Sequence, residues 1–164
     1  MKQLWAPWRM PYLKGEHESV DGCVFCEKIR ADDAEEHVLY RGDRCYVVLN
    51  KYPYSNGHMM VVPYDHVSSL EDLDGATMLE MMHLVQEGLR ILREAQHPQG
   101  FNVGVNIGSA GGAGVASHLH MHIVPRWEGD ANYMTVIGET RVIPEMLDET
   151  YAALRPAFDE LDKT

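Results

Sequence analysis

Three histidines alternate with apolar residues in the segment 118–124, whose sequence is His-Leu-His-Met-His-Ile-Val. Successive side chains of a β-strand point to opposite faces, so this period predicts a strand with His118, His120 and His122 on one surface, neighbours roughly 6.5–7 Å apart. The intervening apolar residues then face the core. They are Leu119, Met121 and Ile123. A strand with three titratable rings on one face and a buried opposite face strongly constrains the fold.

Length and composition predict one domain. The chain has 164 residues, 45% of them hydrophobic, which is enough for a single packed core. We expect this domain to cover residues 23–164, after an N-terminal arm over residues 1–22 that docks through aromatic side chains such as Trp5 and Trp8. The sequence has no run of 18 apolar residues and no recognisable secretory signal, so a cytoplasmic protein is expected.

The formal net charge is −11 at pH 7. Nucleic acids and anionic membranes bind basic surfaces, so this charge argues against both as partners. A phosphate-containing ligand must therefore be held by local groups. Three cysteines are too few for a disulfide scaffold, and Cys45, which lies in an apolar run, is expected to be a buried thiol.

The order of the other predicted elements indicates an α+β domain. The expected strands cover residues 38–40, 45–49, 57–62, 101–107 and 118–124. Apolar residues recur at helical spacing from about 73 to 96, with Asp74 as a candidate N-cap. A second helix is expected after Pro144 and should end or kink near Pro156. We therefore expect an antiparallel sheet with one long inserted helix and a C-terminal helix.

The central histidine of the row is the best candidate for covalent catalysis. A neutral imidazole is a good nucleophile near pH 7 when an acceptor holds its other ring nitrogen, and His120 has a histidine on either side. A metal cluster or a solvated face would give the same alternation. The pattern by itself leaves all three interpretations open.

A glycine-rich loop at 108–114 leads into the histidine strand. Such a loop can present backbone N–H groups to an anion without interference from side chains, which would suit a phosphate. It is not a P-loop, because no Gly-Lys-Ser/Thr follows, and it does not contain GxGxxG. A flexible connection is the plainer alternative.

Cys23 and Cys26 form a CxxC pair. A tetrahedral zinc site needs four ligands, and no second CxxC occurs in the chain, so histidines would have to complete the site. Two ordinary thiols are an equally good interpretation of the pair alone.

The motif at 118–124 resembles the signature of the histidine triad family of nucleotide hydrolases and transferases. Asn50, eight residues before His58, and the segment Gly-His-Met-Met-Val-Val-Pro at 57–63 are similar to the family's second signature. The resemblance covers roughly residues 23–133. It implies an antiparallel sheet of the histidine triad type with a long inserted helix.

The resemblance also implies roles for individual residues. His120 would attack the α-phosphorus of a nucleotide, and water or another acceptor would then resolve the nucleotidyl-histidine. His122 and His58 match the family's supporting histidines. The positions similar to substrate-binding ones are Asn50 at the ribose, Asn106 at the phosphates, and Phe25 and Met60 at the base.

Zinc-containing members of the family build their metal site from a CxxC pair, a histidine after the second signature and the first triad histidine. The resemblance therefore implies a structural zinc ion bound by Cys23, Cys26, His66 and His118. The triad would then be divided, with His118 structural and His120 reactive.

Flanking segments refine the resemblance. Residues 5–9 and 125–133 look like the bacterial diadenosine tetraphosphate phosphorylase branch, and the fragile histidine triad hydrolases share part of the second segment. Both branches cleave dinucleoside polyphosphates, but phosphate completes the reaction in one and water in the other. Such substrates normally arrive with Mg²⁺. Family members are usually homodimers with a continuous sheet, and the N-terminal arm and Trp127 would make contacts across such an interface. Trp127 is also counted among the candidate substrate-binding residues.

One departure from the family pattern concerns the phosphate contacts. Many members carry a glutamine or a hydroxyl residue just before the triad, whereas here Ser117 or the backbone amides of Gly112 and Gly114 would have to serve. His122 stands where the galactose-1-phosphate uridylyltransferase branch has glutamine, which disfavours hexose-phosphate transfer. The alternatives to dinucleotide cleavage are a purine nucleoside phosphoramidase and a non-catalytic nucleotide-sensing protein.

Overall fold

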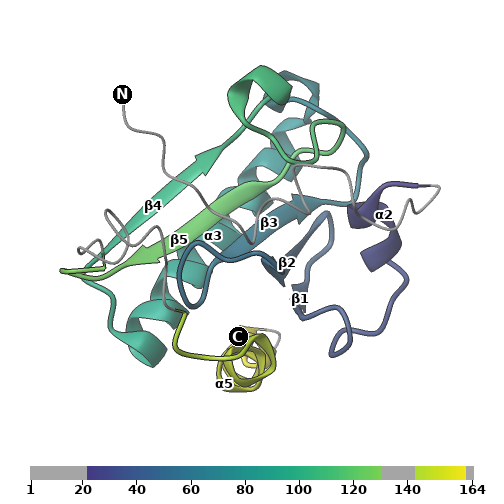
Figure 1. Ribbon diagram of the computed structural model, residues 1–164. Coiled ribbons are helices and arrows are strands. Elements are labelled where there is room, and N and C mark those ends of the chain that lie inside the picture. The colour runs from purple at the N-terminus through teal and green to yellow at the C-terminus, as the bar shows by residue number, and fades with distance from the viewer. Residues whose placement is uncertain (1–21, 131–142, 162–164) are drawn as a thin grey trace, which may run out of the picture.

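The computed structural model describes residues 22–130 and 143–161, and its strands form one antiparallel sheet in the order β1-β2-β3-β5-β4 (Figure 1). The strands are β1 (Val38–Arg41), β2 (Cys45–Leu49), β3 (Met59–Pro63), β4 (Gly100–Val105) and β5 (Met121–Arg126). The helices are α2 (Val24–Lys28), α3 (Gly75–Gln96) and α5 (Leu147–Asp159), with short 3₁₀ turns η2 (Leu70–Asp72) and η3 (Ser109–Gly111). The expected N-terminal arm lies outside the described residues except for Gly22.

This arrangement confirms the predicted α+β fold. α3 is inserted between β3 and β4, and α5 follows the sheet. The N-cap of α3 is Asp74, whose side chain accepts a hydrogen bond of 2.7 Å from the Thr77 N–H. The helix ends at His97, which has a left-handed conformation with φ of 50°. None of the helices in the described ranges is long and apolar enough to cross a bilayer.

Several expected boundaries differ by a residue or more, and the clearest differences are in the histidine strand and the C-terminal helix. The histidine strand begins at Met121 rather than at residue 118. The reason is that the Leu119 N–H donates to the Val67 carbonyl, in the segment between β3 and α3, at 2.7 Å. Of the two expectations for Pro156, a helix end and a kink, the helix end is wrong, since α5 continues to Asp159. Leu154 and Phe158, on either side of the proline, are fully buried, and their packing outweighs the missing N–H of Pro156.

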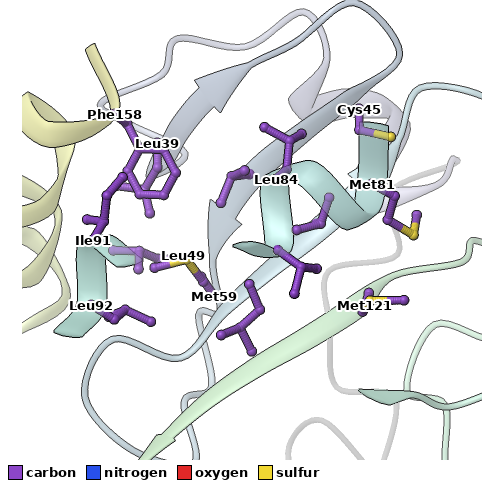
Figure 2. Close-up of a cluster of buried hydrophobic side chains, with 14 of the residues drawn as sticks. Leu39, Cys45, Leu49, Met59, Met81, Leu84, Ile91, Leu92, Met121 and Phe158 are labelled. Carbon is purple, nitrogen blue, oxygen red and sulfur yellow. The ribbon is translucent and has the colours of Figure 1, made fainter. Parts of the chain in front are cut away.

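The main core lies between one face of the sheet and helices α3 and α5. Figure 2 shows Leu84 and Leu92 of α3 gathered with Leu49 and Met59 of the sheet. The predicted inward-facing residues of the histidine segment all belong to this core, as does Cys45. They are Leu119, Met121 and Ile123. The prediction that these three residues face the core is therefore confirmed, but burial does not alternate, because His118 and His120 are buried as well.

Helix α3 approaches strands β3 and β5 closely at Gly88. A Cβ on Gly88 would lie 3.0 Å from Ile123 Cδ1 and 3.2 Å from Met59 Sδ, so this close contact leaves little room for a side chain. Ile123 follows His122 directly in β5, so the packing of α3 against Ile123 also helps to position His122.

A smaller cluster fills the opposite face of the sheet, and an arginine holds its covering helix. The cluster includes Phe25 of α2 and Met60 of β3. The Arg41 side chain donates to three carbonyls at the end of α2, those of Lys28, Ile29 and Ala31. Arg41 also pairs with Asp33, which accepts a second bond from Arg155 of α5. A five-residue helix has little stability of its own, so these contacts hold α2 against the sheet.

Candidate active site and metal centre

The histidines lie on the sheet face opposite α3. His122 in β5 pairs across the sheet with Met60 of β3 and Gly104 of β4. Its neighbours Met121 and Ile123 point into the main core, so the His122 ring points to the other face. His120 precedes the strand, and its ring centroid lies 4.9 Å from that of His122.

The backbone fixes the proton on the His120 ring. His120 Nδ1 lies 2.8 Å from the carbonyl oxygen of His118. A carbonyl can only accept, so Nδ1 carries the hydrogen, and Nε2 of the neutral ring keeps its lone pair. Burial lowers the pKa of the His120 imidazole, and the hydrogen bond to the carbonyl opposes this shift only in part. The arrangement favours a neutral ring whose Nε2 can act as a nucleophile.

A second hydrogen-bonded chain fixes the proton on His122. The backbone N–H of Tyr54 donates to His58 Nδ1 at 3.0 Å, so neutral His58 carries its hydrogen on Nε2. That Nε2 lies 3.0 Å from His122 Nδ1, which must then accept. The neutral His122 ring consequently carries its own hydrogen on Nε2. The site thus combines a bare nitrogen on His120 with an N–H donor on His122.

Four side chains converge at the start of α2. Ligand atoms of Cys23, Cys26, His66 and His118 all lie within 4.8 Å of one another. Cys23 Sγ is 3.2 Å and Cys26 Sγ 3.5 Å from His118 Nδ1, and Cys26 Sγ is 3.2 Å from His66 Nδ1. Tetrahedral zinc with two sulfur and two nitrogen ligands requires separations of roughly 3.3–3.8 Å. The residues therefore fit a zinc ion with a complete set of four protein ligands.

The surroundings of this cluster also suit a metal. His118 Nε2 lies 2.9 Å from the Pro63 carbonyl oxygen, which fixes the hydrogen on Nε2 and leaves Nδ1 facing the cysteines. His118 is 1% exposed, and burial lowers the pKa of its ring. Burial also raises the pKa of the Cys26 thiol, so a bound cation would have to stabilise the thiolate. A zinc ion here would tether α2 to the segment that leads into β5.

The sequence matches the model of the HIT domain family over residues 31–129. The chain belongs to the HIT domain family. It is 44% identical over 157 residues to AP-4-A phosphorylase from Mycobacterium tuberculosis, a match that covers 92% of this chain and 80% of that protein. It is 35% identical over 108 residues to an adenylylsulfatase from Arabidopsis thaliana, covering 66% of this chain and 54% of that protein.

Solved HIT structures share the fold. A Zn-bound histidine triad family protein from Mycobacterium smegmatis superposes with a TM-score of 0.69 at 28% identity. This match covers 87% of our chain and 97% of the other.

Several predicted substrate-binding residues of this HIT domain lie beside the histidines. The Phe25 ring centroid is 4.8 Å from that of His120. Met60 pairs with His122 in the sheet. Asn50 Nδ2 lies 3.4 Å from both ring nitrogens of His58, while Asn50 Oδ1 accepts from the Tyr52 N–H.

The remaining predicted residues lie at the end of β4 or in the loop that precedes the histidines in the chain. Asn106 directly follows β4, next to Val105, which pairs with Met121. Gly112, Gly114 and Ser117 are exposed in the loop before the histidines, and Gly112 has a φ of 87°.

Trp127 is not brought to the triad. It lies beyond the other end of β5, roughly 20 Å along the chain from His120, and its indole N–H donates to the Gln96 carbonyl. Sequence reasoning also missed Tyr54, whose position in a loop gives no periodic signal.

Proposed function

We propose that this HIT protein cleaves dinucleoside polyphosphates through a nucleotidyl-His120 intermediate and passes the nucleotide to inorganic phosphate. The observation that carries the proposal is the 2.8 Å contact between His120 Nδ1 and the His118 carbonyl, which leaves Nε2 bare. The preference for phosphate over water rests on the similarity to AP-4-A phosphorylase.

In the first step, His120 Nε2 attacks the α-phosphorus of diadenosine tetraphosphate. A bond forms between nitrogen and phosphorus while the α,β-anhydride bond breaks, and ATP leaves. The His122 Nε2–H donates a hydrogen bond to a phosphate oxygen on which charge develops. In the second step, an oxygen of inorganic phosphate attacks the same phosphorus, releases His120 and gives ADP.

The remaining candidate residues would bind substrate. Phe25 and Met60 would contact the base, Asn50 the ribose, and Asn106 with Ser117 the phosphate chain. Backbone N–H groups of Gly112 and Gly114 would add phosphate contacts. Mg²⁺ arriving with the substrate would offset part of the repulsion between the polyphosphate and a protein of net charge −11. The four-residue cluster would hold zinc and position His118.

Product analysis tests the proposal. Purified protein is incubated with diadenosine tetraphosphate and Mg²⁺, with and without inorganic phosphate, and nucleotides are separated by chromatography. We expect ADP and ATP, with turnover that depends on phosphate. AMP and ATP at a rate independent of phosphate would contradict phosphorolysis, and no cleavage in either buffer would contradict the proposed function as a whole.

We also propose that the protein is a homodimer joined through the edge strand β4. β4 lies at one end of the sheet. Val103 in β4 and Ile107 just after β4 are each 43% exposed.

Replacing Val103 with glutamate should convert the dimer to a monomer, because it places a charge on the joined edge. Sedimentation velocity measures the change. Val24→Glu, at a 40% exposed site on α2, is the matched control and should stay dimeric. A monomeric parent protein would contradict the proposal.

A further inference from the structure

The loop between β2 and β3 is fastened around His58. The Tyr52 N–H donates to Asn50 Oδ1 at 2.9 Å, and the His58 N–H donates to the Ser55 carbonyl at 3.2 Å. The Ser55 hydroxyl donates to the Pro125 carbonyl of β5 at 2.8 Å. The first two bonds lie within the loop and the third ties it to β5, so Tyr54 is presented to the histidines from a braced backbone.

Tyr54 contacts His58 in two ways. Its backbone N–H donates to His58 Nδ1 at 3.0 Å, and its ring stacks on the imidazole with centroids 4.8 Å apart and planes inclined by 19°. The Tyr54 ring centroid also lies 6.4 Å from that of His122. We propose that Tyr54 is a positioning residue that fixes the plane and the tautomer of His58, and through His58 the proton on His122.

The direction of the hydrogen-bond chain depends on this contact. With His58 held as it is, Nε2–H donates to His122 Nδ1, and His122 keeps a hydrogen on Nε2. If the His58 ring rotates or changes tautomer, its Nε2 can accept from His122 Nδ1 instead. Neutral His122 would then have a bare Nε2 and no hydrogen for a phosphate oxygen.

Asn50, which also lies near His58, does not set this direction. Asn50 Nδ2 is 3.4 Å from both ring nitrogens, so it does not distinguish one from the other. The Tyr54 backbone N–H distinguishes the two nitrogens, because it can only donate and therefore requires a bare Nδ1. Stacking of the Tyr54 ring keeps the imidazole in the orientation that this N–H requires.

Nitrogen NMR provides the direct test of the tautomer. In ¹⁵N-histidine-labelled protein, protonated and bare ring nitrogens have well-separated shifts, and His58 is assigned by its loss in His58→Gln. We expect bare Nδ1 and protonated Nε2 in the parent protein and in Tyr54→Phe, which keeps the stacked ring. Tyr54→Leu, which loses it, should give an averaged mixture of tautomers.

A matched control separates positioning from general stability. Tyr151 of α5 makes another ring contact with a histidine, His37, with centroids 5.7 Å apart, on an element away from the triad. Tyr151→Leu should leave the His58 shifts unchanged even where the melting temperature falls. A His58 tautomer unchanged in a folded Tyr54→Leu variant, or altered equally by Tyr151→Leu, would overturn the inference.

The effect on turnover rests on the proposed function. Tyr54→Leu should lower kcat on diadenosine tetraphosphate by about tenfold to a hundredfold with KM changed little, because a misdirected donor affects the transition state more than binding. Tyr54→Phe, which keeps the stacked ring, should have a kcat close to that of the parent protein. An altered tautomer with unchanged kcat would overturn the catalytic part of the inference. Absence of cleavage by the parent protein would refute the proposed function and leave the tautomer result standing.

Discussion

Replacing His120 with glutamine is expected to lower kcat on diadenosine tetraphosphate by at least about 10⁴-fold, because glutamine has no nucleophilic ring nitrogen. At 1.36 kcal/mol per tenfold change, this corresponds to roughly 5 kcal/mol of lost transition-state stabilisation. KM should change little, because the phosphate and base contacts remain. Steady-state kinetics of product release measure the loss.

A trapped intermediate gives a second measurement for the same variant. Acid-labile nucleotidyl-histidine should appear on the peptide that contains His120 when the parent protein is quenched at high pH and examined by mass spectrometry. The glutamine variant should show none. His97→Asn is the matched control, because His97 is an exposed histidine in a left-handed conformation that asparagine tolerates. Near-parental turnover by His120→Gln would refute covalent catalysis at this residue.

The sequence predicted those parts of the fold that depend on local patterns. Alternation along residues 118–124 correctly separated the core residues from the histidines, because the period of a strand fixes which side chains share a face. Asp74 was correctly placed at the start of α3, because an N-cap bond joins residues three apart in the chain. The chain order of the five strands, α3 and α5 followed from the same patterns, whereas α2 was not predicted.

What the sequence could not predict depends on contacts between distant segments. The late start of β5 results from the bond between Leu119 and the Val67 carbonyl, which no periodicity reveals. The continuation of α5 through Pro156 depends on how Phe158 packs under the sheet. Cys23 and Cys26 alone left the metal question open, and His66 was added through the family resemblance. Tyr54 escaped notice because it lies in a loop without periodicity, and its contacts with His58 depend on how that loop folds back.

Removing a cysteine from the four-residue cluster is expected to abolish zinc binding and to destabilise the fold. The parent protein should contain about one zinc ion per chain by elemental analysis, and Cys26→Ala almost none. Loss of a ligand present at about a thousand times its dissociation constant costs roughly 4 kcal/mol. At 2–4 °C per kcal/mol for a chain of this size, the melting temperature should fall by about 10 °C.

The buried third cysteine supplies the control for this experiment. Cys45 lies in the main core, and burial with nearby acidic groups raises its pKa to about 12, so it stays a neutral thiol. Cys45→Ala should lower the melting temperature through a cavity while zinc content stays at the parental value. A chelator should destabilise the parent protein and Cys45→Ala but have no further effect on Cys26→Ala. A parent protein that contains no zinc and melts at the same temperature with and without chelator would refute a zinc site at Cys23, Cys26, His66 and His118.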